Sequence, residues 1–65
     1  MNRLRCYLKI HLSTGKTIDV NETLEHVGPL SDESVFNTCS NWVYDNYNTS
    51  ELKGSLISVQ WRKLS

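Results

Sequence analysis

The middle of the chain has no basic side chain. Lysine and arginine are absent from Thr17 to Leu52, although all 7 carboxylates of the sequence lie in that stretch. The 7 basic residues lie before and after it, so the formal net charge of +0 combines an acidic middle with two basic ends. The acidic middle is the most informative feature of the sequence for function. It does not amount to a catalytic motif.

Long apolar runs are also missing. Lys9 and His11 interrupt the first apolar segment, which leaves no stretch suited to a signal peptide or long enough to cross a bilayer. We therefore expect a cytosolic protein without membrane contact. In that compartment Cys6 and Cys39 are expected to be reduced thiols.

Recognisable catalytic and metal-binding motifs are absent. The 2 cysteines and 2 histidines include no pair at the close spacing of zinc sites. Gly15-Lys16-Thr17 resembles the tail of a phosphate-binding loop, but Ile10 stands where that loop requires a glycine. No serine, threonine or cysteine has a sequence-adjacent base and orienting acid. The sequence predicts no metal, no cofactor and no enzymatic activity.

The chain is short, and its composition is that of a folded domain. Hydrophobic residues make up 38% and charged residues 22% of the 65 residues, which favours one globular domain over residues 1–65. Such a small domain has a marginal core. Because no disulfide framework or metal motif supplements that core, the sequence favours a homodimer.

Apolar and polar residues alternate from Leu4 to Leu12, which predicts a strand with one buried face. Residues 13–16 predict a turn with Gly15 available for positive φ, and Thr17 to Val20 predicts a second strand. Residues 21–27 are compatible with a single helical turn or with a loop.

Ser31 is the predicted N-cap of an amphipathic helix, with Asp32 and Glu33 in its first turn. Apolar residues then recur at spacings of three and four: Val35, Phe36, Cys39, Trp42, Val43 and Tyr47. Residues 48–54 predict a polar connection, and Leu56 to Leu64 predicts a final strand. The sequence therefore predicts an α+β fold, in which a three-stranded antiparallel-type sheet carries one main helix on one face, in the order β-β-α-β.

The acidic middle has two interpretations. The carboxylates are consistent with a solvated surface that stabilises the helix start. Alternatively, they present a negative surface to a basic groove on a DNA-binding protein, with buried aromatic side chains as anchors. For this second interpretation the candidate partner-binding residues are Asp19, Glu22, Glu25, Asp32, Glu33, Phe36, Trp42 and Tyr44. The acidic middle and the basic ends are expected to form two differently charged faces.

A nucleic-acid-binding module is the alternative function. The outward face of the first and last strands would carry Arg3, Arg5, Tyr7, Lys9 and Arg62, a basic surface with one aromatic ring. The neutral overall charge argues against tight phosphate binding, which depends on counterion release. A solvated strand face also explains this pattern.

Four local features resemble the small uracil-DNA glycosylase inhibitors of some podoviruses that infect Gram-positive hosts. They are the hairpin at residues 12–17, the acidic stretch after it, Leu30-Ser31-Asp32 leading to Phe36, and the strand ending in Lys63-Leu64. The resemblance implies a homodimer whose acidic helix region imitates DNA and whose phenylalanine, here Phe36, enters a pocket of the glycosylase. Helical periodicity alternatively places Phe36 toward the core.

These observations together predict a small, non-enzymatic, phage-type protein that binds and inhibits a DNA-repair or defence enzyme of the host. Uracil-DNA glycosylase is the best single target. The mechanism would be steric and electrostatic, with carboxylates that align the partner and aromatic side chains that anchor it.

Overall fold

The computed structural model describes residues 1–64, so Ser65, which ends the predicted domain 1–65, lies outside the described residues. Its elements are the strands β1 (Asn2–His11), β2 (Thr17–His26) and β3 (Leu56–Lys63) and the helices α1 (Asp32–Asn46) and α2 (Thr49–Leu52). The three strands form one antiparallel sheet in the order β2-β1-β3. The predicted α+β class, three-stranded sheet and main helix are confirmed.

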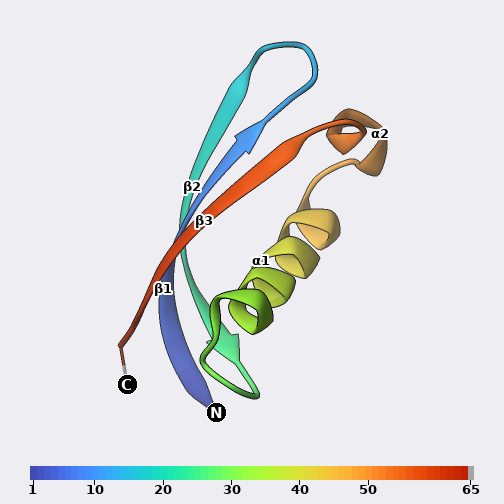
Figure 1. Cartoon of the computed structure of the whole chain (residues 1–65). Coiled ribbons are helices and arrows are strands. Elements are labelled where there is room, and N and C mark those ends of the chain that lie inside the picture. The colour runs from blue at the N-terminus through green and yellow to red at the C-terminus, as the bar shows by residue number, and fades with distance from the viewer. Residues whose placement is uncertain (65) are drawn as a thin grey trace.

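The central strand β1 supplies half of the core. Its alternate side chains Leu4, Cys6, Leu8 and Ile10 are all buried. They point toward α1, which contributes the buried side chains of Val35, Cys39 and Val43. Figure 1 shows α1 lying along one face of the twisted sheet, while the other face has no helix over it. We call the uncovered face the outer face.

The strand β2 is longer than the sequence predicted. It pairs with β1 along its whole length, from Thr17 opposite His11 to His26 opposite Asn2. Both interpretations of residues 21–27, a helical turn and a loop, are therefore wrong for residues 21–26. Leu24 continues the inward-facing row of Ile18 and Val20, and pairing with a ten-residue β1 satisfies the backbone more fully than one helical turn would. The predicted turn is confirmed, with Gly15 at φ 94°.

The helix α1 begins where the sequence predicted. Ser31 is its N-cap, and the Ser31 hydroxyl accepts a hydrogen bond from the Ser34 backbone N–H at 3.2 Å. The helix contains several asparagine, serine and threonine residues with low helix propensity, so its stability depends on packing against the sheet.

Residues 48–54 were predicted to be a polar connection, and this is wrong for four of them. Asn48 caps the short helix α2, which buries the side chain of Leu52 to 4% exposure. A single apolar side chain in a polar segment has no periodicity from which burial could be inferred. Leu52 nevertheless extends the core beyond the end of α1.

Candidate functional site

One groove runs between α1 and the edge strand β3. Its cavity volume is about 430 Å³, and its lining residues are Asp32, Glu33, Phe36, Ile57, Val59 and Trp61. We call it the α1–β3 groove. Two carboxylates come from the first helical turn, and the apolar side chains come from α1 and from alternate positions of β3. The groove therefore combines negative charge with aromatic and aliphatic surface, which is a composition suited to protein recognition.

Phe36 lies in this groove and not in the core. Its side chain is 40% exposed, whereas its helical neighbour Val35 is fully buried. The interpretation of Phe36 as a core residue is therefore wrong. The helix contacts the sheet through Val35, Cys39 and Val43, and this narrow stripe leaves Phe36 at the margin. An exposed phenylalanine beside two carboxylates is available to a partner.

A hydrogen bond fixes one end of the groove. The indole Nε1 of Trp61 donates to Oδ1 of Asp32 over 3.0 Å, joining β3 to the first turn of α1. No local sequence pattern predicts this contact, since the two residues are 29 positions apart. Ile57, Val59 and Trp61 are half-buried, and they pack against the core and also line the groove.

His26 holds the loop that leads into α1. The side chain is 2% exposed, with Nε2 lying 2.8 Å from the Pro29 carbonyl oxygen and Nδ1 lying 2.7 Å from Thr38 Oγ1. Ser34 Oγ is 3.2 Å from the same Nε2. These contacts connect β2, the loop and the first two turns of α1, so they position the carboxylates of the groove.

The contact between Ser34 and His26 does not form a nucleophile and base. The Pro29 carbonyl can only accept a hydrogen bond, so Nε2 of His26 carries the hydrogen. Ser34 Oγ therefore accepts from the imidazole and is not activated by it. Nδ1 faces Thr38, which satisfies the second ring nitrogen. This buried network has a structural explanation.

The predicted partner-binding residues do not form one surface. Asp32, Glu33 and Phe36 come together in the α1–β3 groove, but Tyr44, which is 50% exposed, is not among its lining residues. Trp42 is half-buried and packs edge-on against Tyr47, with ring centroids 6.2 Å apart. Tyr44 therefore lies outside the core.

The carboxylates of β2 divide between the two sheet faces. In the register of β1 and β2, Asp19 is opposite Lys9 and Glu25 is opposite Arg3, which places both acids on the outer face among the basic residues. Glu22 pairs with Cys6 and lies toward the helix side of the edge strand. The prediction of two differently charged faces is therefore wrong. Acidic and basic residues that are separate in sequence become neighbours because β1 and β2 pair antiparallel.

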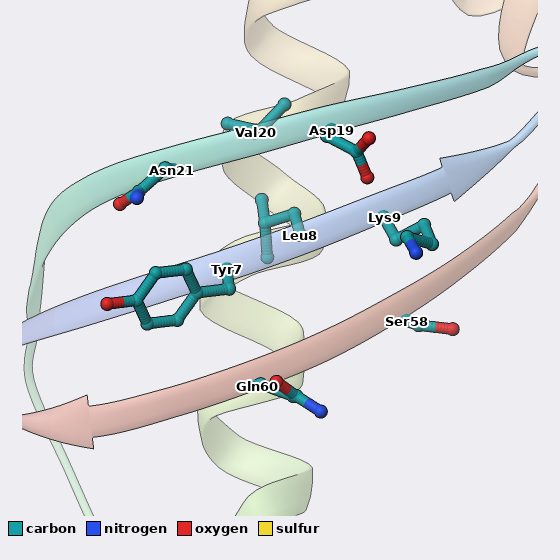
Figure 2. Close-up of a pocket in the computed structure, with 8 residues that line it drawn as sticks. All are labelled: Tyr7, Leu8, Lys9, Asp19, Val20, Asn21, Ser58 and Gln60. Carbon is teal, nitrogen blue, oxygen red and sulfur yellow. The ribbon is translucent and has the colours of Figure 1, made fainter.

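The outer face has a depression of its own. Its cavity volume is about 390 Å³, and it is lined by Tyr7, Leu8, Lys9, Asp19, Val20, Asn21, Ser58 and Gln60. Figure 2 shows the polar side chains and Tyr7 on the near side of the sheet, with Leu8 directed toward the helix behind it. Polar groups from all three strands therefore surround a single aromatic ring.

The two thiols lie in the core, where β1 and α1 meet. Cys6 and Cys39 are free and fully buried. Burial, together with a smaller effect of the neighbouring Cys6, raises the pKa of Cys39 to about 12. Burial also raises the pKa of Cys6, against a smaller opposing effect of its hydrogen bond with Cys39. Neutral buried thiols of this kind are inert packing groups.

Comparison with protein-family models, with curated proteins and with solved structures finds no match to this chain. Within residues 1–64, no three histidine, cysteine, aspartate or glutamate side chains gather closely enough to hold a metal ion. None of the helices in that range has the length and apolar character needed to cross a membrane. The α1–β3 groove and the outer-face depression are thus the two candidate sites.

Proposed function

We propose that this protein is a non-enzymatic inhibitor of phage type, which binds a DNA-acting enzyme of the host through the α1–β3 groove. Uracil-DNA glycosylase in the bacterial cytoplasm is the proposed target. The observation that carries the proposal is the exposure of Phe36 beside Asp32 and Glu33 in one groove. The resemblance of the hairpin, helix start and final strand to the podovirus inhibitors supports the same target.

Asp32 and Glu33 supply the electrostatic part of recognition. Both are exposed at the N-terminus of α1, and no basic residue occurs in the chain between Thr17 and Leu52. A cleft that normally holds DNA is positively charged, so these carboxylates would occupy positions equivalent to phosphates and accelerate encounter. Glu22 of β2, which lies toward the helix side of the sheet, adds longer-range attraction, which salt screens more strongly.

Phe36 supplies the apolar part of recognition. Interface energy concentrates in aromatic side chains that become fully desolvated in a pocket, and Phe36 has 40% of its surface available for this. Ile57, Val59 and Trp61 line the rest of the groove and would exclude water around the anchor. Tyr44 lies outside the groove and has no role in this mechanism.

Self-association through the free edge of β3 completes the proposal. Both β2 and β3 have an unpaired edge in the described sheet, but β2 carries Asp19, Glu22 and Glu25, whereas β3 carries no carboxylate. Antiparallel pairing of two β3 strands would place the terminal Arg62 and Lys63 of one copy far from the same residues of the other copy. Sedimentation equilibrium tests this part, and a monomer at micromolar concentration would contradict it.

The main test measures uracil excision by a purified bacterial uracil-DNA glycosylase in the presence of the protein. We expect stoichiometric inhibition that excess DNA relieves, because both ligands compete for one cleft. The variant Phe36→Ala should lose about 2 kcal/mol or more of binding energy, whereas Tyr44→Ala should bind normally. Full glycosylase activity at a tenfold excess of the protein would reject the target.

A charge-reversal experiment tests the electrostatic mechanism. The double variant Asp32→Lys and Glu33→Lys should lower the association rate by about tenfold or more at low salt. The matched control reverses Asp45 and Glu51, which are exposed but lie outside the groove. Equal rates for the two double variants would show that net charge alone, and not the groove, governs association.

A further inference from the structure

Tyr7 occupies the centre of the outer face. Its side chain is 41% exposed, and the sheet register places Asn21 of β2 on one side of it and Gln60 of β3 on the other. Figure 2 shows the Tyr7 ring extending along β1, with Asn21 on the neighbouring strand β2 and Gln60 on the neighbouring strand β3. An open aromatic face bordered by amide donors and acceptors is suited to a flat heterocycle that also has hydrogen-bonding edges.

Cations stand on both sides of Tyr7 along β1. Arg5 comes before it and Lys9 after it on the same face, each at two residues' distance, or about 6.7 Å along the strand. Arg5 is also directly opposite Arg62 of β3. Like charges in direct cross-strand positions repel each other, which favours separation of the two guanidinium groups.

The Arg62 guanidinium has no acidic neighbour on the outer face, and Arg5 is turned away from it. Nη1 of Arg5 donates to Thr23 Oγ1 over 3.0 Å, which directs the Arg5 guanidinium toward β2 and away from Arg62. The outer-face neighbours of Arg62 in the register are Arg5 directly opposite, and Arg3, Tyr7 and Gln60 around it. None of these neighbours is acidic.

The acidic residues of the outer face are confined to one side. Asp19 and Glu25 both belong to β2, opposite Lys9 and Arg3. The seam between β1 and β3 therefore carries cations, the Gln60 amide and one aromatic ring, with Ser58 opposite Lys9 at its far end. Along this seam, cationic side chains lie on both sides of the Tyr7 ring, on which a flat group could stack.

We propose that the β1–β3 seam of the outer face binds a short segment of single-stranded nucleic acid, with one base stacked on Tyr7. Arg62 contacts the phosphate on one side of that nucleotide, and Lys9 contacts the phosphate on the other side. Cations on both sides point to a continuing strand and not to a free nucleotide. The amides of Gln60 and Asn21 hydrogen-bond the edge of the base.

Asp19 sets a preference among bases. Its carboxylate lines the same depression as Tyr7, and a carboxylate only accepts hydrogen bonds. Bases with an exocyclic amino group offer donors to it, and thymine has none of these. This site lies on the sheet face opposite the α1–β3 groove and does not depend on the proposed inhibition.

The test is a fluorescence anisotropy titration of labelled single-stranded DNA twelve-mers with the intact protein. We expect binding that weakens as salt rises, with oligo(dC) or oligo(dA) bound more tightly than oligo(dT). Unlabelled duplex and free mononucleotide serve as competitors. Absence of binding at low salt would overturn the proposal, as would equal competition by duplex or by mononucleotide.

Matched variants localise the binding. Tyr7→Ala should reduce the affinity by about fivefold or more, whereas Tyr7→Phe keeps the ring and should retain it. Arg62→Ala should reduce the salt dependence by about one phosphate contact, and Lys53→Ala provides an exposed cation outside the outer face as its control. Circular dichroism checks that each variant is folded. Equal affinities for Tyr7→Ala and the unmodified protein would rule out the stacking site.

Discussion

Trp61 donates from its indole Nε1 to the Asp32 carboxylate at 3.0 Å, so that the edge strand β3 holds the first turn of α1 by a side chain. Both residues line the α1–β3 groove. One oxygen of the Asp32 carboxylate therefore accepts a hydrogen bond from within the protein. Trp61 makes no such hydrogen bond to the neighbouring Glu33. This contact keeps the acidic end of the groove in one position relative to Phe36.

Removal of the indole N–H should weaken this connection. Trp61→Phe keeps most of the ring but loses the donor, and we expect the free energy of unfolding to fall by about 0.5–1.5 kcal/mol in urea denaturation. A double-mutant cycle with Asp32→Ala separates the hydrogen bond from the lost ring area. A coupling energy of zero in that cycle would mean that the contact contributes nothing to stability.

His26 should be far more important for stability than the other histidine. His26→Ala leaves the Pro29 carbonyl and the Thr38 hydroxyl without their ring partner, and we expect a loss of about 1–3 kcal/mol. His11→Ala is the control, because His11 is exposed and its contact with Thr17 Oγ1 is long, at 3.5 Å. That variant should stay within about 0.5 kcal/mol of the unmodified protein. Similar losses in the two variants would contradict the positioning role of His26.

The core thiols should make the fold sensitive to alkali. The pKa of Cys39 is raised from 9.0 to about 12, so between these values the unfolded chain loses a proton that the folded chain retains. Stability is therefore complete below pH 9 and falls as pH rises, by about 1.4 kcal/mol per pH unit for one thiol. Cys39→Ala should show a shallower decline between pH 9 and pH 12. Parallel curves would argue against this coupling.

Two leucines test the contribution of α2. Leu52 is 4% exposed and Leu56 is 72% exposed, although they are only a few residues apart. Leu52→Ala should cost about 2–5 kcal/mol through lost burial and a cavity, whereas Leu56→Ala should change stability by less than about 0.5 kcal/mol. Thermal or urea unfolding of both variants measures the contrast. A small effect at Leu52 would mean that α2 detaches from the core at little cost.

Local patterns predicted the parts of the fold that local physics determines. The alternation of β1, the turn at Gly15, the Ser31 cap and the row of Ile57, Val59 and Trp61 each depend on residues close in sequence. The extension of β2 to His26 depends instead on the length of its partner strand, which no pattern within residues 21–26 reveals. Burial of Leu52 likewise depends on where the chain returns to the sheet.

The candidate site was only partly predictable for the same reason. Asp32, Glu33 and Phe36 were identified because they are adjacent on one helix, and the structure keeps them together. Trp61 was not identified as a groove residue because its contact with Asp32 spans 29 positions. The charges of β2 were assigned to the wrong surface, since only the register shows that Asp19 lies opposite Lys9. Cross-strand pairing brings together acidic and basic side chains that lie in separate clusters along the sequence.

The strand order β2-β1-β3 also bears on how the chain reaches its fold. The hairpin of β1 and β2 can form as soon as residue 26 has been synthesised, because a short turn joins these strands. Pairing of β1 with β3 must wait for residues 56–63, and the long loop closure between them slows it. Until then one edge of the central strand, with its apolar row, stays open to other chains. Nascent chains that stall before β3 should therefore aggregate, and truncation after residue 54 provides a direct measurement of that tendency by light scattering.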